Sequence, residues 1–156
     1  MSVDQFLYRR RRQSGFTLIE VMVSILIFAF GILGLVGLQA SAIRFSTDAQ
    51  QRAEATFLAD QLLARMLIAD PATAATFGHM PSGTTACAPT GAASTNAVVT
   101  EWLSEVAAAF PLATADVQQI IVSGTPANDV TVRLCWQNGT NGTPHTLEVS
   151  NRVQWQ

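Results

Sequence analysis

Few side chains in this protein are placed to carry out chemistry. The two histidines, His79 and His145, have no acid or nucleophile near them in a triad arrangement. Glu101 and Glu105 lie one helical turn apart, a spacing that on an exposed helix indicates a solvated face. The sequence also lacks a glycine-rich phosphate loop and a metal-ligand cluster. We therefore predict that the protein is not an enzyme and takes no cofactor, metal ion or small-molecule substrate.

The two cysteines, Cys87 and Cys135, lie 48 positions apart. Neither belongs to a Cys-x-x-Cys pair or stands beside a histidine at metal-ligand spacing, which argues against zinc binding and redox catalysis. In an oxidising compartment they would form one disulfide, and closing a loop of that length would stabilise the fold by about 3–4 kcal/mol. Two buried free thiols are the alternative.

An acid at the start of a long apolar run is the strongest chemical signal. The 23 residues from Phe16 to Leu38 carry a single charge, Glu20. As a helix they would be roughly 35 Å long, enough to span a bilayer core of about 30 Å. Four consecutive arginines precede the run: Arg9, Arg10, Arg11 and Arg12. By the positive-inside tendency these arginines stay cytoplasmic, so the bulk of the protein lies across the inner membrane after a single pass.

The order of these parts is not that of a secretory signal peptide, in which the apolar region precedes the cleavage site. Here the candidate cut, between Gly15 and Phe16, comes before the apolar run. That is the layout of a leader removed on the cytoplasmic side. The new α-amino group of Phe16 would lie four residues from Glu20 and could neutralise it, on the same chain or on a neighbour. A signal anchor with a stray acid is the alternative.

The segment GFTLIEV (residues 15–21), together with the arginines and the apolar run, resembles the prepilin cleavage motif of type IV pilins and type II secretion pseudopilins. The resemblance implies that a prepilin peptidase cuts after Gly15 and methylates Phe16. It also implies that Glu20 supports assembly, in one view by pairing with a neighbour's N-terminus. Residues 30–39 (FGILGLVGLQ) further resemble the helices of minor pilins of the PilV type. The resemblance covers the N-terminal third of the sequence.

Loss of the leader would make the protein acidic. Without residues 1–15 it holds five arginines against ten acids and no lysine, a formal net charge of −5. Nucleic acid is therefore an unlikely partner.

The helix is expected to continue from Gln39 to about Asp70, where Pro71 ends it. Asp48 and Arg52 are spaced to form an i,i+4 ion pair. A stripe suited to packing under a sheet contains Ala55, Leu58, Ala59, Leu62 and Met66.

The rest of the sequence predicts a small sheet. Residues 71–97 have the composition of a surface loop. Residues 98–110 form a short amphipathic helix in which Trp102 is a core anchor. Three strands follow, at residues 118–123, 130–137 and 146–155, and the Asn-Gly pairs at 138–139 and 141–142 place a hairpin between the last two.

Together these features predict an α+β, pilin-like fold with a long N-terminal helix packed on a small antiparallel sheet. The expected segments are a leader (1–15), a membrane-spanning half-helix (16–38), an amphipathic half-helix (39–70) and a periplasmic or extracellular globular domain (71–156). The first functional hypothesis is a minor pilin that contacts other minor and major pilins through this helix and ends at the cell surface. The others are a minor pseudopilin, a module at the pilus tip that binds cells or DNA, and an ordinary anchored periplasmic protein.

Overall fold

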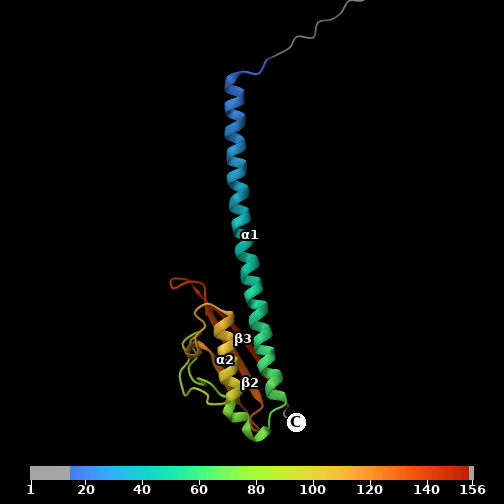
Figure 1. Cartoon of the computed structure of the whole chain (residues 1–156), viewed down its shortest axis with the longest axis vertical. Coiled ribbons are helices and arrows are strands. Elements are labelled where there is room, and N and C mark those ends of the chain that lie inside the picture. The colour runs from blue at the N-terminus through green and yellow to red at the C-terminus, as the bar shows by residue number, and fades with distance from the viewer. Residues whose placement is uncertain (1–14, 155–156) are drawn as a thin grey trace, which may run out of the picture. The chain divides into compact units, whose positions relative to one another are not determined.

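The computed structural model describes residues 15–154. Its elements are, in order, α1 (Leu18–Leu67), the 3-10 helix η1 (Pro71–Phe77), α2 (Ala97–Ala109), the 3-10 helix η2 (Ala115–Val117), β1 (Gln119–Ser123), β2 (Asp129–Gln137) and β3 (Pro144–Arg152) (Figure 1). The predicted α+β architecture, a long N-terminal helix with a small antiparallel sheet, is confirmed. The protein divides into two compact units, Met1–Phe45 and Ser46–Gln156, called below the N-terminal unit and the C-terminal unit.

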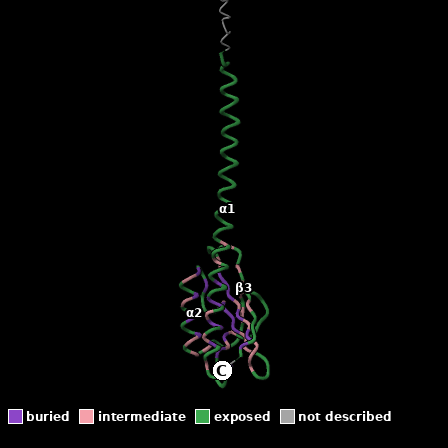
Figure 2. The backbone as a smooth tube through the Cα atoms, turned by 90° about the vertical axis from the view of Figure 1, so that its right-hand side faces the viewer, coloured by how far each residue is buried: buried purple, intermediate pink, exposed green. Residues whose placement is uncertain are grey.

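The described part of the N-terminal unit is the first half of α1, preceded by three residues outside the helix. The helix begins after Thr17, whose carbonyl accepts hydrogen bonds from the backbone N–H groups of Glu20 (3.1 Å) and Val21 (3.4 Å). Every residue from Gly15 to Thr47 is exposed (Figure 2). The most apolar 18-residue window of α1 has a mean hydropathy of 2.7 and none of it is buried, and α1 is long and apolar enough to cross a membrane.

The second half of α1 belongs to the C-terminal unit and buries one face. All five residues of the predicted apolar stripe are buried, and Leu63 joins them. The predicted ion pair is present, with Arg52 Nε 3.0 Å from Asp48 Oδ2. This half of the helix is therefore amphipathic, as the 3.6-residue period indicated.

The segment after α1 differs from the prediction. The helix ends at Leu67, before Asp70, and residues 71–77 form the helix η1 instead of a surface loop. Asp70 is the reason, because its side chain accepts a hydrogen bond from the N–H of Ala72 at 2.9 Å and caps η1, with Pro71 in the first helical position.

Helix α2 brings a tryptophan side chain into the core. Asn96 caps it by accepting a hydrogen bond from the N–H of Val98 at 2.9 Å. Trp102 is fully buried, and its Nε1 donates to the Leu58 carbonyl of α1 at 2.8 Å. Trp102 is thus a core anchor, as predicted.

The three strands form one antiparallel sheet in the order β1-β2-β3. The alternation predicted for β2 is confirmed, since Val130, Val132, Leu134 and Trp136 are all buried and share one core with α1 and α2. Strand β3 begins two residues earlier than predicted and ends at Arg152. Trp155, placed in that strand by the sequence, lies outside the described residues.

Candidate functional site

Gly15 and Phe16 lie in the short stretch before α1. Residues 15–17 are not helical, and Phe16 is 83% exposed. A peptidase needs an accessible, non-helical peptide bond, so the local structure is compatible with the predicted cut. Arg9, Arg10, Arg11 and Arg12, to which the sequence assigned the membrane topology, lie outside the described residues.

Glu20 occupies the first turn of α1, where a carboxylate interacts favourably with the partial positive charge of the helix N-terminus. Among residues 15–154 no cation forms an ion pair with its side chain. The residues around it, such as Leu18 and Ile19, are exposed and apolar. The acid therefore stands in an apolar surface without a counter-charge from the described part of its own protein.

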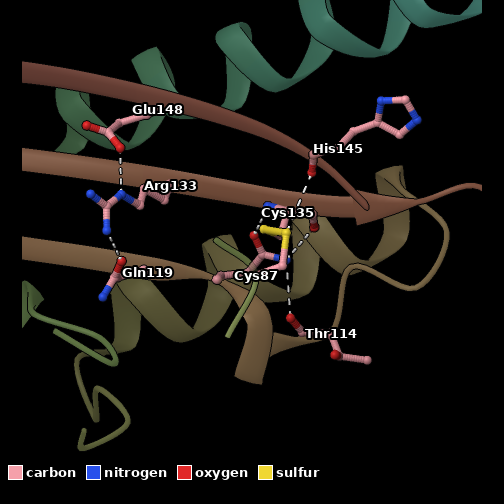
Figure 3. The surroundings of a disulfide bond; sticks show 8 residues. Cys87, Thr114, Gln119, Arg133, Cys135, His145 and Glu148 are labelled. Carbon is pink, nitrogen blue, oxygen red and sulfur yellow. Dashed lines mark hydrogen bonds and ion pairs between the residues drawn. A yellow bond between two sulfur atoms is a disulfide. The ribbon is translucent and has the colours of Figure 1, made fainter. Parts of the chain in front are cut away.

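The disulfide predicted between Cys87 and Cys135 is present, with the two Cα atoms 5.4 Å apart (Figure 3). It ties the loop between η1 and α2 to strand β2. Gln118, fully buried, holds the same point of the strand: its Nε2 donates to the Cys135 carbonyl at 2.9 Å and its Oε1 accepts from the Cys135 N–H at 2.8 Å. The bond is part of the packed domain and leaves no free thiol among the described residues.

Gln119 holds the same loop at a second point. Its Nε2 lies within hydrogen-bond distance of the carbonyls of Met80 (2.9 Å), Ser82 (2.8 Å) and Gly83 (3.2 Å). Its Oε1 accepts from Arg133, which also pairs with Glu148 across the sheet (Figure 3). The loop thus has a defined position on the sheet.

The histidines are committed to separate structural contacts. His79 is buried; its Nδ1 accepts from the Ser94 N–H at 3.1 Å, so Nε2 is the nitrogen that donates to the Ala115 carbonyl at 2.8 Å. His145 stacks on Trp136, with ring centroids 5.7 Å apart. Neither contact involves a nucleophile.

Glu105 requires a correction, because the sequence placed it on a solvated face. It pairs with Arg65 of α1, with Nη2 2.7 Å from Oε1 and both side chains less than a third exposed. Glu105 supplies the counter-charge of this guanidinium. The other terminal nitrogen, Arg65 Nη1, is buried without a hydrogen-bond partner among the described residues. Glu101, one turn earlier, is exposed as predicted.

The four arginines of the C-terminal unit are each paired with an acid. The pairs are Arg52–Asp48, Arg65–Glu105, Arg133–Glu148 and Arg152–Asp129. The hydrogen bond to Asp129 raises the pKa of Arg152. These guanidinium groups are engaged within the unit, which weakens the case for a phosphate-binding surface.

A cluster of polar residues joins α1 to the end of the β2–β3 hairpin, and sequence reasoning missed it. We call Asp48, Gln51, Asn138 and His145 the polar cluster. Gln51 and Asn138 exchange two hydrogen bonds, at 2.9 and 3.0 Å, and Asp48 Oδ1 lies 3.4 Å from His145 Nδ1. Contacts between residues so far apart in sequence leave no local signal.

No group of three or more metal-ligating side chains gathers within residues 15–154. The described residues therefore provide one feature suited to binding other molecules, an exposed apolar helix with a single acid near its start. This helix continues into a packed, disulfide-bonded unit.

Comparison with known families found one match. The profile of the prokaryotic N-terminal methylation motif matches residues 10–36, which contain Gly15, Phe16 and Glu20. No curated protein and no solved structure matches the sequence.

Proposed function

The protein is a member of the type IV pilin and pseudopilin superfamily by its methylation motif and its α+β architecture, and on this premise we propose that it is a minor pilin of the PilV type. In this role it takes part in assembling or priming a type IV pilus. The superfamily consists of structural proteins that are processed at the N-terminus and then assemble.

Processing involves Gly15 and Phe16, and assembly involves Glu20. Prepilin peptidase cuts between Gly15 and Phe16 and methylates the new amino group of Phe16. Glu20 then pairs with that amino group, on the same chain or on a neighbour. The exposed, non-helical backbone at residues 15–17 and the lack of a described counter-charge for Glu20 support these assignments.

The motif, the arginines and the apolar helix also support a location for each part of the protein. Residues 16–38 cross the inner membrane before assembly, with Arg9–Arg12 on the cytoplasmic side. The helix continues to Leu67, and the globular domain of residues 71–156 lies in the periplasm and later on the pilus. A disulfide is typical of such an oxidising compartment.

One observation carries the proposal: the first half of α1 exposes apolar side chains on every face. Leu26, Phe28, Phe30 and Leu33 are each more than half exposed. Such a surface needs lipid before assembly and neighbouring helices after it, because a large exposed apolar area is unstable in water. Heterologous contacts between helices propagate into a filament without closing.

Mass spectrometry of the N-terminal peptide tests the processing step. Membranes with prepilin peptidase should yield a peptide that starts at N-methylated Phe16, and membranes without it should yield the leader still attached. A Gly15→Leu variant should also keep its leader in cells that contain the peptidase, while Gly37→Leu, a glycine later in the helix, should be cleaved normally. A peptide that retains Arg9–Arg12 in every sample would overturn the proposal.

Deletion of the gene tests the PilV-type role against that of a pseudopilin, whose N-terminus has the same motif. Surface pili should decrease while exoprotein secretion continues. Normal pili together with lost secretion would assign the protein to a type II secretion system.

A further inference from the structure

The loop between β2 and β3 contains the triplet Asn-Gly-Thr twice, at residues 138–140 and 141–143. We propose that Asn141 is a site of spontaneous deamidation in the folded protein and that the polar cluster protects Asn138 from the same reaction. Both asparagines are exposed, so burial does not distinguish them. Their hydrogen bonds do.

The reaction needs only the protein and water. The backbone nitrogen of Gly142 attacks Cγ of Asn141, and a new bond between these two atoms closes a five-membered succinimide. The bond between Cγ and Nδ2 of Asn141 breaks, and the amide nitrogen leaves as ammonia. Water then opens the ring to aspartate or isoaspartate. Glycine in the next position favours the attack because it has no Cβ to obstruct the ring.

Asn138 is held away from this path. Its Oδ1 accepts from Gln51 Nε2 at 2.9 Å, and its Nδ2 donates to Gln51 Oε1 at 3.0 Å. Gln51 is itself fixed by the indole of Trp136, whose Nε1 donates to Oε1 at 3.2 Å. For Cγ of Asn138 to rotate toward the next backbone nitrogen, both hydrogen bonds to Gln51 must break.

Asn141 has no such restraint. Among residues 15–154, its side chain shares no hydrogen bond. The loop is held through backbone carbonyls instead, since Gln137 Nε2 lies 3.3 Å from the Thr140 oxygen and 2.6 Å from the Gly142 oxygen. Before it can attack, the Gly142 nitrogen must release its turn contact to the Gly139 carbonyl, at 3.1 Å, on an exposed loop.

The product differs in charge. Each conversion adds one negative charge to a protein that already has an excess of acids after processing. Because no enzyme is required, the converted fraction at residue 141 increases with the time a folded molecule has existed.

The test is a time course on the full-length protein in detergent micelles at neutral to mildly alkaline pH. Peptide mass spectrometry resolves the mass increase, and isoaspartate methylation identifies the product. Asn141 should convert at least about fivefold faster than Asn138, since the net free energy of one hydrogen bond changes an equilibrium by about that factor. In urea the two rates should become similar, because the triplets are identical.

Two variants separate protection from local sequence. Gln51→Ala should raise the rate at Asn138 toward that at Asn141 and leave Asn141 unchanged. Gln50→Ala, at an exposed neighbouring position, is the matched control and should change neither rate. Near-UV circular dichroism confirms that both variants are folded. Equal rates in the folded wild-type protein, or an unchanged Asn138 rate in folded Gln51→Ala, would overturn the proposal.

Discussion

The two halves of α1 use similar apolar residues but place them in opposite environments. In the first half Phe28 is 69% exposed, whereas in the second half Leu62 is fully buried under α2 and the sheet. The acids differ in the same way: Glu20 has no counter-charge among the described residues, whereas Asp48, in the second half, pairs with Arg52. The C-terminal unit thus buries its apolar side chains and pairs its arginines within itself. Under the proposed function, the N-terminal unit needs lipid or other subunits to cover its apolar side chains. The predictions below test this contrast, beginning with the largest expected effect.

Glu20→Ala should reduce assembly by about a hundredfold, because the amino group of Phe16 would then lose its partner, and an uncompensated charge in an apolar setting costs about 2.5–3.5 kcal/mol. Quantifying pili sheared from cells measures the loss. The unfolding free energy of the C-terminal unit should not change. Glu54→Ala, an exposed acid in the second half of the helix, is the control and should assemble normally. Normal piliation in Glu20→Ala would remove the assembly role of this acid.

Trp102→Ala should destabilise the C-terminal unit by about 3–5 kcal/mol, because it leaves a large cavity and removes the hydrogen bond to Leu58. Urea unfolding of the full-length protein in micelles, followed by near-UV circular dichroism, gives the change. Phe57→Ala removes an aromatic ring that is 66% exposed and should alter stability by less than about 0.5 kcal/mol. Similar losses in both variants would contradict the assignment of the core.

Replacing Cys87 and Cys135 together by serine should cost about 3–4 kcal/mol by the loop-entropy relation. The same unfolding assay applies, and reduction of the wild-type disulfide should lower its stability to a similar extent. Insertion of the N-terminal unit in the membrane should continue, since no described cysteine lies in it. A variant as stable as the wild type would show that the loop is held by its other contacts alone.

Glu105→Gln should destabilise the C-terminal unit by about 1 kcal/mol, because the half-buried Arg65 loses its counter-charge. High salt should reduce the difference in unfolding free energy between this variant and the wild type, because it screens the ion pair. Glu101→Gln, one turn earlier on the exposed side of α2, should have almost no effect. If both variants behave alike, the contact between Arg65 and Glu105 contributes nothing measurable.

Local patterns in the sequence predicted most of the C-terminal unit. The 3.6-residue period selected Leu58 and Leu62, alternation selected the buried side of β2, and Asn-Gly pairs located the hairpin. The helix η1 was missed although Asp70-Pro71 contains its signal, an N-cap followed by a proline.

Contacts between distant residues could not be predicted in this way. Gln51 and Asn138 are 87 positions apart, and Arg65 and Glu105 are 40 apart. A periodic pattern shows which side of a helix or strand is polar. It does not identify the side chain on another element that this polar side contacts. The motif at residues 15–21, in contrast, could be recognised because its residues are adjacent in the sequence.

The double attachment of the loop after η1 has an evolutionary consequence. Gln119 holds the loop as far as Gly83, and the disulfide holds it again at Cys87. The three residues between them, 84–86, are fixed at both ends whatever their side chains are. Selection for folding therefore constrains these positions weakly, and we expect close relatives to vary there while keeping the two attachments.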